Sequence, residues 1–225
     1  DYAVTISGEG TYSITNGTIR VTATEYNGTF DNAGHTAGLT ADVSGAKFYY
    51  SKDQQLTAAN YTDQAVASGQ KPSFKQAGSY TIYYYVTAEN YNVASGSVKV
   101  NISKSNQEVI LSDSSFEYDG SAHTVTAAAS SLEGQIVYGW YKGDTVSENA
   151  KMTSAPVQAG TYTVIASVTG AADYLDAQKQ ARVTVTQRPL TLTADSASKV
   201  YDGQPLQMKS YQTTGGSLAN GDTIV

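Results

Sequence analysis

The heptapeptide QAGSYTI at residues 76–82 recurs almost unchanged as QAGTYTV at residues 158–164. In each copy a tyrosine follows an Ala-Gly pair and opens a run in which the side chains at alternate positions are apolar. A period of two residues is typical of a β-strand that turns one face towards a core. The two copies therefore predict two strands of the same kind, with Ile82 and Val164 facing inward.

Two further markers occur in the same order and at nearly the same spacing. A segment at 100–103 that resembles a closing strand recurs after 83 residues at 183–186. A triplet of tyrosine, asparagine or aspartate, and glycine recurs after 92 residues and again after 83, and it is typical of a tight turn. The triplets are Tyr26-Asn27-Gly28, Tyr118-Asp119-Gly120 and Tyr201-Asp202-Gly203. Markers that keep their order and spacing predict an internal repeat.

The markers divide the chain into two whole units and pieces of two more. We call residues 17–104 repeat 1 and residues 105–187 repeat 2; residues 188–225 open a further repeat, and residues 1–16 are expected to be the tail strand of a preceding one. Units of this length are typical of sandwiches of about seven short strands. The extra length of repeat 1 is expected to lie in a loop or helical turn at 57–69.

The Ala-Gly-x-Tyr marker resembles strand F of immunoglobulin domains, in which a tyrosine hydroxyl ties back to the preceding corner. The resemblance implies that Tyr80 and Tyr162 are corner residues. Trp140 falls where strand C belongs, and Tyr49 is taken as its counterpart in repeat 1. Trp140 and Tyr141 point to opposite faces of one strand, so either of them could face the core.

Together the markers resemble the bacterial immunoglobulin-like repeats of the YDG or MBG type, which occur in arrays in cell-surface proteins. The text that carries this resemblance includes YDGSAHT at 118–124, QAGSYTIYY at 76–84 and KVYDGQPL at 199–206. The resemblance covers nearly the whole chain. It implies an all-β fold of tandem immunoglobulin-like β-sandwiches, and it implies a role as a stalk or an adhesion module.

Composition excludes several function classes. The net charge of −6 disfavours a nucleic-acid partner, because phosphate binding needs clustered lysine and arginine. No apolar run approaches the length of a membrane-spanning helix, so no membrane insertion is expected in this segment. The absence of cysteine excludes disulfides and thiolate metal sites, and no residue pattern indicates a cofactor.

Residues that could support catalysis or metal binding have a simpler explanation. Ser121 and His123 lie two positions apart on what reads as one strand near Asp119, without a nucleophile elbow, and the equivalent of His123 recurs as His35. Recurrence with the repeat favours a structural role. We therefore predict that the chain is not an enzyme. No ligand spacing indicates zinc or an EF-hand, and solvated loop carboxylates are favoured over a calcium site.

Tyrosines on the outer face of repeat 1 are the candidate ligand-binding residues. If Tyr84 faces the core, Tyr83 and Tyr85 point outward, and Tyr49 on the neighbouring strand extends the patch. Aromatic rings can stack on the apolar faces of sugars, so the alternative prediction is a module for host or dietary glycans or mucin. A simpler reading is that tyrosine suits an exposed sheet surface. At the matching positions repeat 2 has Ile165 and Ser167.

Two hypotheses remain, both for an extracellular or cell-surface bacterial protein. In the first, the repeats are spacers joined by short linkers, with Pro189 stiffening one junction and 104–106 lacking such a restraint. In the second, repeat 1 is a glycan-binding adhesion module that uses its exposed tyrosines.

Overall fold

The structure is a computed structural model, and it describes residues 8–10, 13–131, 133–207 and 210–224. The chain divides into two compact units, Asp1–Ser105 and Asn106–Val225. Within the described ranges the single helical element is the 3-10 turn η1 (Glu148–Ala150). The prediction of an all-β chain built from tandem immunoglobulin-like β-sandwiches is confirmed.

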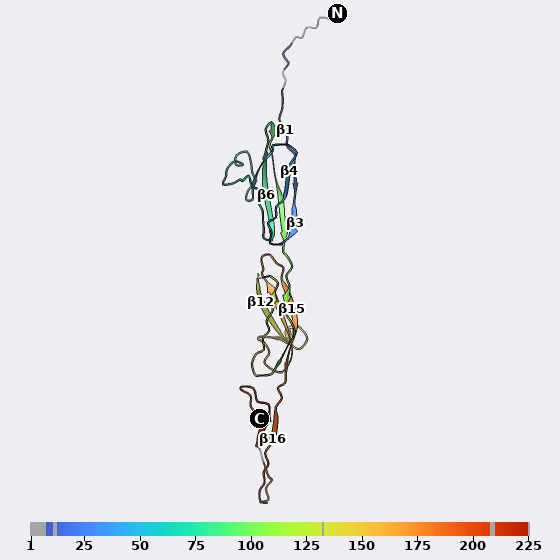
Figure 1. The fold of residues 1–225 in the computed structure, drawn as a ribbon, viewed down its shortest axis with the longest axis vertical. Helices are drawn as coiled ribbons and strands as arrows, with labels where there is room; N and C mark the ends of the chain where they lie inside the picture. The colour runs from blue at the N-terminus through green and yellow to red at the C-terminus, as the bar shows by residue number, and fades with distance from the viewer. Residues whose placement is uncertain (1–7, 11–12, 132, 208–209, 225) are drawn as a thin grey trace. The chain divides into compact units, whose positions relative to one another are not determined.

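The strands of the first unit are β1 (Gly17–Thr18), β2 (Val21–Thr24), β3 (Tyr26–Thr29), β4 (Gly38–Ala41), β5 (Lys47–Ser51), β6 (Gly78–Thr87), β7 (Tyr91–Asn92) and β8 (Ala94–Ser103). The main sheet has the order β3-β8-β6-β5, and a second sheet pairs β2 with β4 (Figure 1). β3 runs parallel to β8, whereas β6 is antiparallel to both of its neighbours. Fully buried aliphatic side chains of β6 and β8, among them Ile82 and Val100, form the core.

The strands of the second unit are β9 (Val109–Ile110), β10 (Ser114–Glu117), β11 (Ala128–Ala129), β12 (Gln135–Lys142), β13 (Lys151–Met152), β14 (Gly160–Thr169), β15 (Ala177–Thr186), β16 (Thr191–Ala194) and β17 (Tyr211–Gly215). The main sheet has the order β10-β15-β14-β12-β13, and smaller sheets pair β9 with β11 and β16 with β17. The last pair belongs to the further repeat. Trp140, Val164 and Val183 lie in the core cluster of repeat 2.

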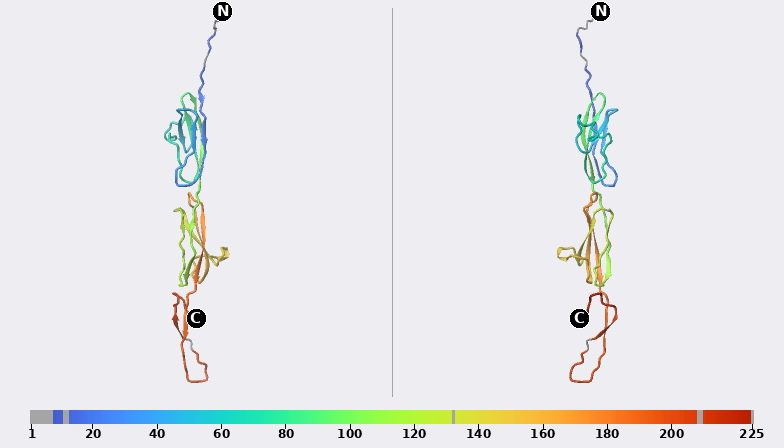
Figure 2. Two further views of the ribbon diagram at one scale, coloured as in Figure 1. Left: turned by 45° about the vertical axis from the view of Figure 1, so that its right-hand side comes forward. Right: turned by 90° about the vertical axis from the view of Figure 1, so that its left-hand side faces the viewer.

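Both repeats place strands equivalent to C, F and G of an immunoglobulin domain side by side, as β5-β6-β8 and as β12-β14-β15. In repeat 1 most of the chain between β5 and β6, residues 52–76, forms a long segment in place of regular strands. Its amides close turns at 57–67, and it touches the edge of β5 through a bridge between Tyr50 and Ser68. This segment stands beside the main sheet (Figures 1 and 2). The predicted loop at 57–69 is confirmed.

The two predicted tyrosine corners are present. The Tyr80 hydroxyl donates to the Gln76 carbonyl at 3.0 Å, and the Tyr162 hydroxyl donates to the Gln158 carbonyl at 2.8 Å. Ile82 and Val164, two residues further on, are fully buried. Packing around these two side chains therefore takes the place that the disulfide has in antibody domains.

We expect Tyr162→Phe to lower the free energy of unfolding of repeat 2 by about 1 kcal/mol, because the Gln158 carbonyl loses the hydroxyl that donates to it in a part-buried hydrogen bond. Tyr80→Phe should cost repeat 1 less, since the Tyr80 ring is more exposed and water can replace the lost contact. Urea unfolding measures both. Tyr211→Phe, on an exposed ring, is the control, and an equal loss in the control would contradict the expectation.

Trp140, and not Tyr141, faces the core of repeat 2. Trp140 is 7% exposed and pairs with the buried Val164. The expectation that Tyr49 is its counterpart is wrong. Tyr49 pairs with Tyr85 of β6. The residue of β14 that matches Tyr85 is Ser167, and Ser167 pairs with Val137. Val137 is therefore the counterpart of Tyr49.

The expected turn at Tyr26-Asn27-Gly28 is also wrong, because these residues lie in β3 and pair with β8. The true equivalent of Tyr118-Asp119-Gly120 begins at Phe30: the Phe30 amide donates to the last residue of β8, and the Tyr118 amide donates to the last residue of β15. Strand pairing thus aligns Phe30 of repeat 1 with Tyr118 of repeat 2, four residues later than the sequence comparison that aligned Tyr26 with Tyr118.

The expected tail strand at 1–16 falls largely outside the described residues. Residues 8–10 and 13–16 are described; they are exposed and form no strand. A strand needs a partner for its backbone groups, and pairing in repeat 1 begins with β1.

Candidate functional site

An aspartate-capped turn recurs in all three repeats, and we call it the Asp turn. The carboxylates of Asp31, Asp119 and Asp202 each accept the amide N–H of the residue two positions on, at 2.8 to 2.9 Å. The residue after each aspartate has a positive φ: 66° at Asn32, 82° at Gly120 and 78° at Gly203. Asparagine and glycine tolerate this left-handed conformation best, and this preference explains the motif.

A histidine packs behind the Asp turn in both full repeats. His35 Nε2 lies 2.8 Å from Asp31 Oδ1, and His123 Nε2 lies 3.4 Å from Asp119 Oδ1. His35 and the adjacent amide of Ala33 hold the pKa of the Asp31 carboxyl below its usual value, with the backbone hydrogen bond as the larger cause. His123 is buried. These contacts assign the recurring histidines to the framework, and Asp119 accepts the backbone N–H of Ser121.

The aromatic partner of each histidine comes from a different position. Phe116 stacks on His123 with ring centroids 4.8 Å apart, whereas Tyr26 stacks on His35 at 4.4 Å. The Tyr26 ring lies over Gly28, where any side chain would collide with it. Gly28 is therefore needed to leave space for the Tyr26 ring, and it does not form a turn.

The three candidate tyrosines of repeat 1 share the outer face of the main sheet, as the alternation of residues predicts. Tyr49 and Tyr85 are direct cross-strand partners, and Tyr83 lies two residues earlier on β6. The expectation that Tyr85 is exposed is wrong, because this side chain is 4% exposed. Tyr61 from the 52–76 segment covers it: the Tyr61 ring stacks on Tyr85 at 4.6 Å and meets Tyr49 edge-on at 5.0 Å.

A groove with a volume of about 700 Å³ lies beside the first half of β6. Its lining combines aromatic and polar side chains from both ends of the 52–76 segment and from β6. The lining residues are Lys52, Asp53, Pro72, Ser73, Phe74, Ser79, Tyr80, Thr81 and Tyr83. Tyr83 is half-buried, and Lys52 and Asp53 are exposed. Of the three candidate tyrosines, Tyr83 alone lines the groove.

Sequence reasoning missed Lys52, Asp53 and Tyr61. Lys52 and Asp53 are ordinary surface residues in the sequence. Tyr61 lies in the extra length of repeat 1, so an aromatic residue in that insertion was the available signal.

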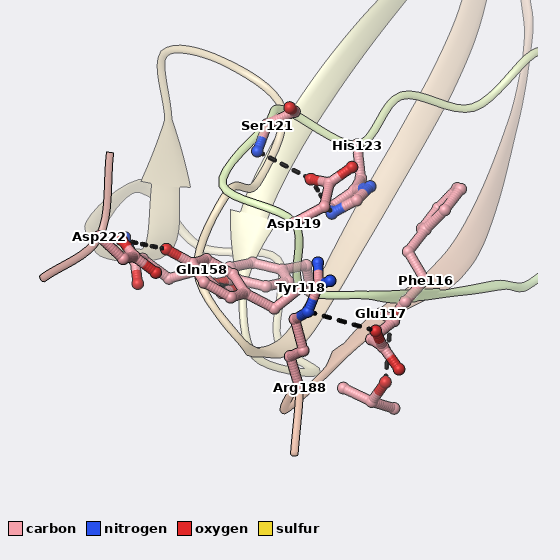
Figure 3. A network of polar contacts seen from close by, with 11 residues as sticks. Phe116, Glu117, Tyr118, Asp119, Ser121, His123, Gln158, Arg188 and Asp222 are labelled. Carbon is pink, nitrogen blue, oxygen red and sulfur yellow. Dashed lines mark hydrogen bonds and ion pairs between the residues drawn. The ribbon is translucent and has the colours of Figure 1, made fainter. Parts of the chain in front are cut away.

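At one end of repeat 2, side chains of the repeat contact residues of the further repeat (Figure 3). The Tyr118 hydroxyl donates to Asp222 Oδ1 at 3.1 Å. Arg188 points towards Glu117, with Nε 3.9 Å from Oε1, and its Nη2 donates to Ser217 Oγ at 2.6 Å. The hydrogen bond that the Tyr118 hydroxyl donates to Asp222, followed by desolvation and by the negative charges of Asp222 and Asp119, raises the pKa of Tyr118 above its usual value.

Among the described residues, no three histidine, aspartate or glutamate side chains gather closely enough to hold a metal ion. In the same part of the chain, no helix is long and apolar enough to cross a membrane.

Neither a family model nor a curated protein matches the chain. Among solved structures it is similar to Drosophila N-cadherin EC1-3 (11% identity, 73% of this chain, 64% of that chain, TM-score 0.29). It is also similar to SGBP-B of Bacteroides ovatus in complex with a mixed-linkage heptasaccharide (14%, 75%, 48%, 0.29) and to Sidekick-1 immunoglobulin domains 1-5 (12%, 82%, 42%, 0.33). The chain spans less than two thirds of each of these proteins, and at such identities the likeness concerns the fold alone.

Proposed function

We propose that the chain is a run of non-catalytic spacer repeats in a bacterial cell-surface or secreted protein. The observation that carries this proposal is that both repeats are built on the same framework. Both repeats have the tyrosine corner, the Asp turn with its stacked histidine and the parallel edge strand. At matching outer positions repeat 1 has Tyr83 and Tyr85, whereas repeat 2 has Ile165 and Ser167. The shared framework favours a spacer, whereas the difference between the outer faces favours the second candidate function below.

The connection after repeat 2 also favours a spacer. β15 ends at Thr186 and β16 begins at Thr191, so four residues join them. Pro189 within this connection has a fixed φ, and a short connection with few accessible conformations transmits the orientation of one repeat to the next.

A second candidate function is a binding module for host or dietary glycans or mucin, and the groove beside β6 favours it. Tyr83 offers a ring on which a sugar can stack, and Lys52, Asp53 and Ser73 are placed to hydrogen-bond hydroxyl groups. Tyr49 can extend the surface beyond the groove, whereas Tyr85 is covered by Tyr61 and is left out of this proposal. The acidic net charge disfavours nucleic acid as the ligand.

Binding of the full chain to mucin and to a panel of polysaccharides separates the two functions, and we expect no saturable binding. The test variant is Tyr83→Ala, which removes the ring in the groove and leaves Tyr85 in place. The control is Ile165→Ala, at the matching position of repeat 2, where the side chain is also half-buried.

Saturable binding that is lost in Tyr83→Ala and kept in Ile165→Ala would overturn the spacer proposal for repeat 1 and establish the groove as a ligand site. Both variants must show the unfolding curve of the parent chain, so that a lost interaction is not confused with a lost fold.

A further inference from the structure

The Tyr-Asp-Gly triplet of repeat 2 makes contacts that neither proposed function uses. We propose that Tyr118-Asp119-Gly120 is a docking surface, and that its occupant is the segment 217–222 of the following repeat of this same chain. This contact holds the following repeat in one orientation against repeat 2. The inference deepens the spacer proposal and rests on it for its purpose, but the contacts themselves lie wholly within the second unit.

Tyr118 supplies the hydrogen bond across this contact. Its backbone N–H donates to the Thr186 carbonyl at the end of β15, so the sandwich of repeat 2 determines where the ring lies. The hydroxyl then reaches Asp222 Oδ1 at 3.1 Å. A bond to an ionised acceptor is stronger than one between neutral groups, and it selects a single arrangement of the two partners.

Gly120 supplies the space. A β-carbon at this position would lie 3.2 Å from the Asn220 carbonyl oxygen and 3.4 Å from the Ala219 β-carbon. Ala219 is 7% exposed, although its neighbours in the segment are exposed. The glycine therefore has two roles: it adopts the positive φ of the Asp turn, and it lets the backbone of the next repeat come close.

Arg188, in the connection between β15 and β16, contacts both repeat 2 and the following repeat. It donates to Ser217 in the following repeat and lies near Glu117 on the last position of β10. Exposed ion pairs of this length contribute little to stability, so we assign Arg188 a role in orientation.

Repeat 1 shows which substitution of Tyr118 the Asp turn tolerates. Phe30 occupies the position of Tyr118 in an intact Asp turn, so Tyr118→Phe should fold while losing the hydroxyl. Asp222→Ala removes the other partner and lies outside the sandwich of repeat 2. Thr223→Ala, at the next, exposed position, is the matched control.

The chain contains no cysteine, so Ser115→Cys on β10 carries a single spin label. We expect strong paramagnetic broadening of the amide signals of residues 219–222 in the full chain. Tyr118→Phe and Asp222→Ala should each lower the docked-to-undocked ratio by roughly 3- to 10-fold, as expected for one hydrogen bond, and so reduce the broadening. Thr223→Ala should leave it unchanged.

Weak broadening in the parent chain, or equal broadening in all variants, would overturn the docking proposal. Unchanged amide signals of β14 show that repeat 2 is folded in each variant. A ligand found on repeat 1 would end the spacer proposal without altering any of these signals, so the two failures are distinguishable.

Discussion

Trp140→Ala lowers the free energy of unfolding of repeat 2 by roughly 3–5 kcal/mol, while the unfolding of repeat 1 keeps its midpoint. Trp140 is the largest side chain in the core of its repeat and packs where β12 meets β14. Its removal leaves a cavity in a repeat that has no disulfide to limit the unfolded state. A loss of this size is a large part of the stability of a small domain.

Urea unfolding followed by amide signals from each repeat measures this effect. Val137→Ala is the control on the same strand, because Val137 is 60% exposed on the outer face and its truncation should change stability by no more than about 0.5 kcal/mol. Equal shifts of both repeats would show that they unfold as one unit and would contradict the expectation.

Tyr61→Ala lowers the stability of repeat 1 by about 2 kcal/mol and exposes Tyr85. Tyr61 makes one stacked and one edge-on ring contact, with Tyr85 and Tyr49, and each aromatic pair is worth about 0.5–1.5 kcal/mol beyond buried area. The 52–76 segment has little regular structure of its own, so loss of this ring also loosens its attachment to the sheet.

Photochemically induced nuclear polarisation, which enhances the signals of solvent-accessible tyrosines, follows the second effect. Tyr85 should be silent in the parent chain and enhanced in Tyr61→Ala. Gln64→Ala, an exposed residue of the same segment, should change neither stability nor enhancement. An enhanced Tyr85 signal in the parent chain would show that the ring is not covered.

Local sequence was sufficient for the strands and the corners. The alternation in β6 and β14 depends on residues close together in the chain, so the class of fold was predictable. The hydrogen bonds of Tyr80 and Tyr162 were implied by the resemblance to strand F of immunoglobulin domains. The outward direction of Tyr49, Tyr83 and Tyr85 followed from the same alternation. Exposure did not follow, since a residue that points away from one core can still be covered by another segment.

The register of the Asp turn needed the tertiary structure. Tyr26-Asn27-Gly28 looks more like Tyr118-Asp119-Gly120 than Phe30-Asp31-Asn32 does, yet the pairing of β3 with β8 places the turn after Phe30. Phenylalanine can occupy the tyrosine position, and asparagine can adopt the positive φ of glycine. Residue identity alone therefore aligns the wrong triplet of repeat 1 with Tyr118-Asp119-Gly120.

The sequence by itself determined the all-β class and the internal repeat, because alternation and turn chemistry act over a few residues, and its resemblance to strand F of immunoglobulin domains implied the corner tyrosines. Only the tertiary structure decided that Tyr61 covers Tyr85, that Tyr83 lines a groove with Lys52, and that Tyr118 meets Asp222. These contacts join residues 24, 31 and 104 positions apart. Such pairs are brought together by how strands and loops pack, and no local pattern encodes that packing.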